Sequence, residues 1–282
     1  MMTPITDRAG RFSPLKALAL ACLLAPLFYL IYRASIHDLG PLPYKEALRF
    51  IGDWTVRFLV TTLALTPAQR IVNWPKFALI RRMMGVGTFC YAVLHFTLYV
   101  ANTKYQLGFV ASEIVLRIYL TIGFAALLGL SLLAATSTDG AVRRLGVRWK
   151  QLHRLVYAIA ALGLLHYFMQ SKIDVSQATL YAGFFLTLMI YRLAIRRRLQ
   201  LSAPVLAGLA LAGGLATALV EFAWYGLATG VDPWRIAHAN LMLAYGLRPA
   251  VIVTLAGLGV ALIPPAKGLF RRFPASRQTR AA

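Results

Sequence analysis

Apolar runs long enough to cross a bilayer alternate with short polar and basic segments along most of the chain. We read eight such runs, at about residues 17–33, 51–66, 84–102, 115–135, 152–170, 177–194, 203–224 and 248–264. A helix needs about 20 mainly apolar residues to span the hydrocarbon core, and a helix satisfies its own backbone polar groups there. The pattern therefore predicts an all-α, polytopic membrane helix bundle.

Composition supports a membrane protein and excludes a nucleic-acid-binding domain. The chain has 282 residues, of which 59% are hydrophobic, and its mean hydropathy is +0.66. The net charge of +21 could suggest a nucleic-acid partner. However, the basic residues lie in short clusters between apolar runs, which is the positive-inside pattern of membrane proteins. We therefore expect membrane lipid, and no nucleic acid, around this chain.

The distribution of charge predicts the orientation of the helices. Arginine and lysine cluster around residues 8–16, 70–82, 143–154, 192–198 and 267–280, whereas the intervening segments hold few of them and most of the acids. Basic clusters mark the cytoplasmic side, so both termini are expected in the cytoplasm. The first apolar run ends on Tyr32 and Arg33 without a small-residue cleavage site, and we interpret it as a retained span.

The two cysteines offer no redox or metal motif. Cys22 and Cys90 both lie inside apolar runs, and the chain has no CxxC pair. The absence of a CxxCH sequence excludes a covalently attached c-type haem.

Two of the five histidines lie inside apolar runs. His37 and His238 fall in predicted outer loops, where a solvated histidine is the ordinary interpretation. His95 and His166 fall within the third and fifth spans. Ionisable residues inside a membrane mark functional sites by default, although a lone histidine can also simply hydrogen-bond a neighbouring helix.

The depths of His95 and His166 favour a ligand pair. Counted from the cytoplasmic side, His95 is about 12 residues into its span and His166 about 15, or roughly 18 and 22 Å at the helical rise. Two imidazoles at one level on separate helices can hold a bis-histidine b-type haem. The small and aromatic residues around them suit a flat macrocycle, but such residues are common in any membrane helix; they include Gly85, Gly87, Tyr91, Ala92, Phe96, Tyr99, Ala161, Gly163 and Tyr167.

His153 is expected to serve a different level of the membrane. It precedes His166 by about 13 residues, which is roughly 20 Å along a straight helix and some 140° around it. One porphyrin cannot bind both, so His153 would face a second, inner cofactor near Arg81, Arg82 and Arg154. Arginines suit haem propionates or a flavin phosphate. The alternative is that these arginines are ordinary anchors on the cytoplasmic side.

Six short motifs occur in a fixed order along the chain: GDW (52–54), LALTP (63–67), RRMMG (81–85), YAVLH (91–95), WKQLHRLVY (149–157) and LLH (164–166). Together they closely resemble the MsrQ (YedZ) family of the ferric-reductase-like transmembrane superfamily. The resemblance covers about residues 15–198. It implies a domain division into a cytoplasmic tail (1–16), a six-helix haem-binding core (17–198), a two-helix extension (199–264) and a basic cytoplasmic tail (265–282).

The resemblance also implies a function. Members are membrane subunits that pass electrons through b-type haem to MsrP, a periplasmic molybdopterin enzyme that repairs oxidised methionine in envelope proteins. The electrons come from quinol, or from a cytosolic flavin reductase, and FMN is associated with the subunit. The family's haem histidines match His95, His153 and His166, and a cofactor-contacting arginine matches Arg81. The implied location is the bacterial inner membrane.

The residues themselves favour an electron relay over a complete enzyme. The chain has no GxGxxG fingerprint and no plausible nucleophile constellation, so it neither binds a nicotinamide in the usual fold nor suggests covalent catalysis. One or two b-type haems would then be the redox centres. Two alternatives stay open: another cytochrome-b or ferric-reductase-like oxidoreductase with a different outer acceptor, and a non-redox transporter with structural histidines.

Overall fold

The computed structural model describes residues 5–6, 10–171, 174–242 and 246–263. The predicted basic tail at 265–282 lies outside these residues. The chain divides into two compact units, one comprising Met1–Gln69 with Pro75–Tyr181 and the other Arg70–Trp74 with Ala182–Ala282. Each unit is described by itself below.

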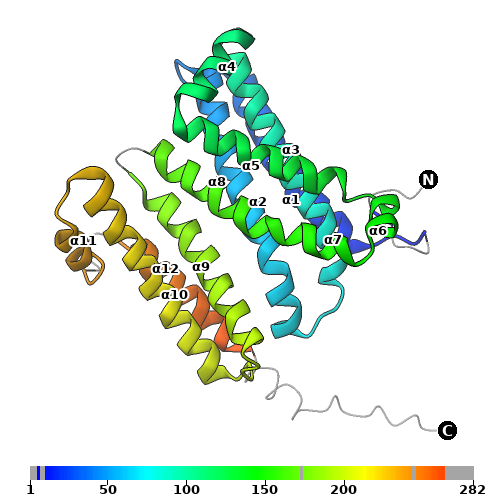
Figure 1. The fold of residues 1–282 in the computed structure, drawn as a ribbon, viewed down its shortest axis with the longest axis vertical. Helices are drawn as coiled ribbons and strands as arrows, with labels where there is room; N and C mark the ends of the chain where they lie inside the picture. The colour runs from blue at the N-terminus through cyan, green and yellow to red at the C-terminus, as the bar shows by residue number, and fades with distance from the viewer. Residues whose placement is uncertain (1–4, 7–9, 172–173, 243–245, 264–282) are drawn as a thin grey trace. The chain divides into compact units, whose positions relative to one another are not determined.

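The first unit is built from helices that follow one another with short connections (Figure 1). They are α1 (Pro14–Ser35), α2 (Pro43–Val72), α3 (Phe77–Asn102), α4 (Leu107–Leu116), α5 (Ile118–Ala135), α6 (Asp139–Leu145), α7 (Val147–Leu152), the short 3-10 turn η1 (His153–Leu155) and α8 (Val156–Ser171). Helix α9 (Ser176–Arg196) starts in this unit and ends in the second.

The second unit holds the rest of α9 and the C-terminal helices. These are α10 (Ala203–Trp224), its π-helical continuation η2 (Tyr225–Thr229), α11 (Pro233–Ala239) and α12 (Pro249–Ala261). Within the described residues there is no β-strand, only an isolated bridge between Thr6 and Phe12. The predicted all-α membrane bundle is confirmed.

Within the described part of the chain, six helical segments are long and apolar enough to cross a membrane. They are Pro14–Ser35, Phe77–Asn102, Ile118–Ala135, Val147–Ser171, Ser176–Arg196 and Ala203–Thr229. The predicted runs at 51–66 and 248–264 also form helices, but they fall short for different reasons. Helix α2 has 30 residues and is long enough, but its charged residues Arg49, Asp53 and Arg57 lower its apolarity. Helix α12 has 13 residues, or about 20 Å, which is less than a hydrocarbon core of about 30 Å.

The fourth predicted run begins later than expected because a polar cluster breaks the helix. Arg117 has extended backbone angles (φ −110°, ψ 106°) between α4 and α5. Its guanidinium pairs with Glu113 and donates to the hydroxyl of Tyr119. The span therefore starts at Ile118 instead of residue 115.

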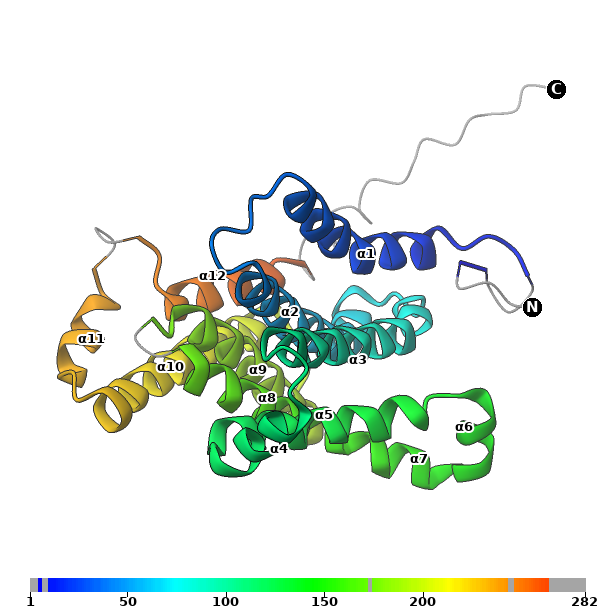
Figure 2. The ribbon, with the colours of Figure 1, turned by 90° about the horizontal axis from the view of Figure 1, so that it is seen from above.

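Neighbouring helices of the first unit pack in the order α1–α3–α5–α8. Figure 2 shows α6 and α7 at one end of α5 and α4 at the other. The α1–α3 contact is fixed by Tyr91, which is 3% exposed and donates its hydroxyl to the Leu23 carbonyl at 2.6 Å. The Tyr91 ring also meets Phe58 of α2 edge to face, with centroids 4.9 Å apart. This packing holds α3, and with it His95, against its neighbours.

In the second unit, helices α9 and α10 interlock through two glycine–threonine pairs. Thr187 donates its hydroxyl to the Gly183 carbonyl at 2.8 Å, and Thr217 donates to Gly213 at 2.7 Å. Each threonine thus satisfies its hydroxyl within its own helix. A Cβ on Gly213 would collide with Thr187, and one on Gly183 would collide with Thr217. Small residues of this kind let membrane helices approach closely without any gain from the hydrophobic effect.

The second unit also contains a buried carboxylate that has two polar partners. Glu221 of α10 is 0% exposed. Its carboxylate forms an ion pair with Arg248, just before α12, and accepts a hydrogen bond from the Asn240 side-chain amide at 2.8 Å. A buried carboxylate is costly unless it is paired and hydrogen-bonded. These contacts therefore tie the segment after α11 and the start of α12 to α10.

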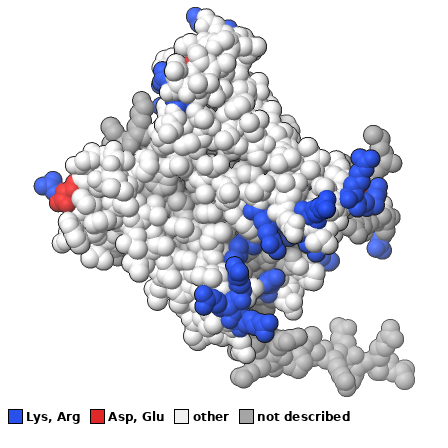
Figure 3. Space-filling model, in the orientation of Figure 1, with Lys and Arg blue, Asp and Glu red and all other residues white. Residues whose placement is uncertain are grey.

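Much of the surface carries no charge. In Figure 3 most of the visible face is free of Lys, Arg, Asp and Glu, and most of the Lys and Arg side chains lie toward its lower right. Many large apolar side chains are exposed, among them Phe28, Ile31, Leu128, Leu211 and Leu219. Exposed apolar residues of this kind are what lipid contact requires. The chain is a multi-pass membrane protein.

We predict opposite effects of two alanine substitutions on α10. Gly213→Ala should cost about 1–3 kcal/mol of stability, because the added methyl group overpacks the contact with Thr187. Gly208 has no atom within 4 Å of its would-be Cβ, so Gly208→Ala should gain about 0.5–1 kcal/mol of helix propensity. Thermal unfolding of both variants in detergent measures the difference. Equal midpoints would contradict this account of the α9–α10 contact.

Candidate functional site

The structure brings together the two histidines that lie deepest in predicted spans. His95 of α3 and His166 of α8 have ring centroids 6.3 Å apart and ring planes at 83°. Their helices are not consecutive in the chain, and both histidines belong to the first unit. The pairing expected from their similar depth is thus present in the fold.

The Nε2 atoms of His95 and His166 are free to bind a ligand. His95 Nδ1 lies 2.9 Å from the Leu48 carbonyl of α2, and His166 Nδ1 lies 2.8 Å from the Tyr119 carbonyl of α5. A carbonyl can only accept, so each Nδ1 carries the hydrogen and each Nε2 keeps its lone pair. Among the described residues, neither Nε2 has a hydrogen-bond partner. This arrangement, in which Nδ1 is held by a carbonyl, is typical of metal-binding histidines.

The spacing of the two rings fits one metal ion between them. Two metal–imidazole bonds of about 2.0–2.1 Å in line separate the nitrogens by about 4 Å, and each ring centroid lies roughly 1 Å beyond its nitrogen. The resulting separation is close to the observed 6.3 Å. No cluster of three or more His, Cys, Asp or Glu side chains occurs in the described part of the chain. Two axial imidazoles suit haem iron, whose other ligands come from the porphyrin.

A partly buried hydrogen bond joins two helices next to the histidine pair. The Tyr167 hydroxyl donates to Asp53 Oδ1 at 2.8 Å, linking α8 to α2. Tyr167 directly follows His166 in α8. On α2, close to Asp53, the Arg57 guanidinium stacks over Trp54, with Cζ 4.8 Å from the ring centroid. This polar contact ties α8 to α2, the helix whose Leu48 carbonyl accepts from His95.

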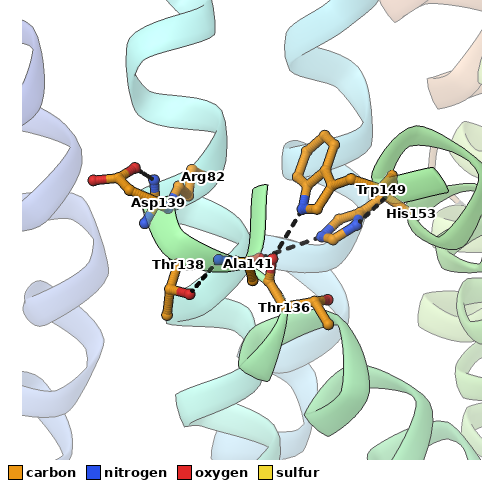
Figure 4. Close-up of polar contacts among 8 residues, drawn as sticks. Arg82, Thr136, Thr138, Asp139, Ala141, Trp149 and His153 are labelled. Carbon is orange, nitrogen blue, oxygen red and sulfur yellow. Dashed lines mark hydrogen bonds and ion pairs between the residues drawn. The ribbon is translucent and has the colours of Figure 1, made fainter. Parts of the chain in front are cut away.

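His153 has a different environment, at the other end of α8 (Figure 4). Its ring stacks on Trp149, with centroids 3.9 Å apart and planes at 26°. Nδ1 lies 3.1 Å from the Trp149 carbonyl and Nε2 lies 3.3 Å from the Ser137 hydroxyl. The indole of Trp149 in turn donates to the Thr136 carbonyl at 2.9 Å. The segment after α5 therefore holds both aromatic rings.

The predicted inner arginines have polar partners of their own. Arg81 donates to the Thr66 hydroxyl at 3.2 Å, and Arg82 pairs with Asp139 at the start of α6 (Figure 4). Arg154 directly follows His153 and is exposed. Contacts of these arginines with a cofactor stay a prediction, as does that of Tyr91, whose hydroxyl is engaged by Leu23.

Several residues of the site were not singled out from the sequence. The Leu48 and Tyr119 carbonyls are backbone groups that no residue type reveals. Ser137 and Asp53 approach their histidine or tyrosine partners only through the fold. The Trp149–His153 stack is the exception, because residues four apart share a helix face and this spacing could have signalled it.

Comparison with known proteins identifies related chains. The family model for the ferric reductase like transmembrane component matches residues 51–164. A protein-methionine-sulfoxide reductase heme-binding subunit MsrQ from Rhodospirillum rubrum is 43% identical over 202 residues, covering 70% of this chain and 95% of the relative.

Two further proteins of the same name are also similar. The one from Herminiimonas arsenicoxydans is 38% identical, with 63% of this chain and 84% of the relative covered. The one from Caulobacter vibrioides is 38% identical, with 64% and 86% covered. No solved structure matches the chain.

We predict that the Asp53–Tyr167 hydrogen bond stabilises the first unit. Tyr167→Phe should cost about 1–3 kcal/mol, since it removes the donor from a carboxylate with limited access to water. Asp53→Asn added to Tyr167→Phe should cost less than it does alone, because the partner has already gone. Tyr29→Phe, at a tyrosine that is 52% exposed, is the control and should change nothing. Thermal unfolding in detergent gives all four values, and strictly additive losses would rule out the coupling.

Proposed function

The chain belongs to the MsrQ family of protein-methionine-sulfoxide reductase haem-binding subunits, and from this premise we propose how it works. It is the membrane subunit that holds b-type haem and passes electrons outward to MsrP, a periplasmic molybdopterin methionine-sulfoxide reductase. The reductase repairs oxidised periplasmic proteins, while this chain supplies its electrons. The single observation that carries the proposal is the His95–His166 pair with both Nε2 lone pairs available.

At the outer level, His95 and His166 are the proposed axial ligands. A bound b-type haem would supply a centre that takes up and releases one electron at a time. The protein contributes two oriented imidazoles and surroundings of low dielectric. The Leu48 and Tyr119 carbonyls hold the proton of each neutral imidazole on Nδ1. Both rings thus present a lone pair without binding a proton there.

At the inner level, we assign His153 to a second cofactor, either another haem or FMN. Arg81, Arg82 and Arg154 lie near it in sequence or at the matching end of α3, and guanidinium groups suit propionates and phosphates. The stack with Trp149 restrains the His153 ring. For this nitrogen to become a ligand, the weak 3.3 Å contact between Nε2 and Ser137 has to give way.

The electron donor in this proposal is external to the chain. Quinol dissolved in the membrane is the donor we favour, and a cytosolic flavin reductase is the second. The absence of a dinucleotide-binding fingerprint from the sequence supports an external donor. The positive-inside distribution of arginine and lysine supports cytoplasmic termini, with the inner cofactor on that side and MsrP on the other. Residues 17–198 form the proposed haem-binding core, and residues 199–264 form an extension.

Reconstitution tests this function directly. The purified chain should show reducible b-type haem bands, and chemical assay should give its haem and FMN content. In liposomes with a quinol and purified MsrP, it should support sulfoxide reduction that neither protein supports alone. Protein without haem would overturn the proposal and favour a transporter. Haem that reduces ferric iron but not MsrP would favour another oxidoreductase of the superfamily.

We predict that the three histidines differ in their effect on haem. His95→Ala and His166→Ala should each abolish the low-spin outer haem, whereas His153→Ala should retain part of the haem signal. His37→Ala, in the loop after α1, serves as the control and should keep it all. Dithionite-reduced minus oxidised spectra of the purified variants measure this. Equal haem retention in the three variants would refute the pairing.

A further inference from the structure

We propose that Gly52 and Gly123 are positioning residues for the two axial histidines. The lack of a Cβ at each lets one imidazole reach a backbone carbonyl on the neighbouring helix. This inference rests on the proposed function, because it concerns how the ligands of a bound haem are held. It assigns a role to two glycines that carry no chemical group of their own.

The two histidine contacts have the same construction. His95 Nδ1 meets the carbonyl of Leu48, and Gly52 lies four residues further along α2. His166 Nδ1 meets the carbonyl of Tyr119, and Gly123 lies four residues further along α5. In an α-helix the carbonyl of residue n accepts from the N–H of residue n+4. Each carbonyl therefore uses one lone pair within its helix and offers the other to the histidine.

A side chain at either glycine would occupy the space of the ring. A Cβ on Gly52 would lie 2.8 Å from His95 Cε1 and 2.9 Å from Nδ1. A Cβ on Gly123 would lie 2.6 Å from His166 Nδ1 and 2.8 Å from Cε1. Real Cβ atoms essentially never approach other atoms to under 3.0 Å. An alanine at either position would push the imidazole away from its carbonyl.

Other glycines near the site differ in what they contact. Gly85 shares α3 with His95, and its nearest neighbour would be Thr62 Cγ2 at 3.7 Å. Gly163 lies one turn before His166, and its nearest neighbour would be Leu59 Cδ2 at 3.8 Å. These are ordinary contact distances, so the histidine helices tolerate alanine there. Gly87 and Gly129 are also closely approached, but by Leu23 and Ile159. Among the described glycines, Gly52 and Gly123 are the ones that a histidine ring approaches, and they lie on the helices that supply the carbonyls.

The close approach has a consequence for the ligand. A hydrogen bond from Nδ1–H to a carbonyl fixes the tautomer and the plane of the ring, and it makes the other nitrogen more basic. A more basic ligand favours the oxidised metal. Displacing the ring weakens this bond, so the bound haem should become easier to reduce and its low-spin ligation less complete.

Spectroscopy of Gly52→Ala and Gly123→Ala tests the proposal. We expect each variant to lose part of its low-spin signal in optical and electron paramagnetic resonance spectra, and to show a more positive midpoint potential. Gly85→Ala and Gly163→Ala are the matched controls and should equal the wild type. Wild-type spectra and potentials in both test variants would overturn the inference. Absence of haem from the wild-type protein would instead overturn the proposed function.

A second measurement covers variants that fold poorly and needs no haem. In the first comparison, Gly52→Ala is measured against the wild type. In the second, Gly52→Ala combined with His95→Ala is measured against His95→Ala alone. Gly123→Ala is compared in the same two ways, with His166→Ala as the second background. We expect the thermal midpoint to fall in the first comparison and not to fall in the second, because the imidazole that the methyl group meets has gone. Equal losses in both backgrounds would assign the glycines to backbone packing alone and overturn the inference.

Discussion

Two hydrogen bonds from histidine to backbone carbonyl determine how this bundle can work. Each crosses between helices, from α3 to α2 and from α8 to α5. Each leaves one imidazole nitrogen as a lone-pair donor in a setting where water does not compete. The ring centroids then lie 6.3 Å apart with the ring planes nearly perpendicular, a spacing that suits a single metal ion. Helix packing in the first unit matters because a small shift of any of these four helices would separate the pair.

Several polar groups elsewhere also find partners inside the protein. Tyr167 donates to Asp53, and Glu221 is held by Arg248 and Asn240. The threonines of α9 and α10 bond to carbonyls of their own helices. In lipid an unsatisfied polar group costs several kcal/mol, by order of magnitude. The contacts of Tyr167 and Glu221 therefore link segments whose apolar surfaces alone would pack equally well against lipid.

Much of the fold could be predicted because the bilayer simplifies the problem. Long apolar runs had to become helices, and all eight runs did so. The limits of two of them were harder to foresee. The polar cluster around Arg117 delays the start of α5, and the charged residues of α2 keep that helix below the apolarity of a typical span. The His95–His166 pairing could be anticipated because equal depth on two helices limits where an imidazole can reach.

The sequence by itself determined that this chain is a membrane helix bundle of the MsrQ family with histidines at two depths. Apolarity, charge clusters and motif order are properties of the chain in one dimension. Only the tertiary structure decided which carbonyl each imidazole meets, because Leu48 and Tyr119 contribute backbone atoms that every residue has. It also decided what a side chain at Gly52 or Gly123 would collide with, since the imidazole ring that fills each space comes from a different helix, distant in sequence.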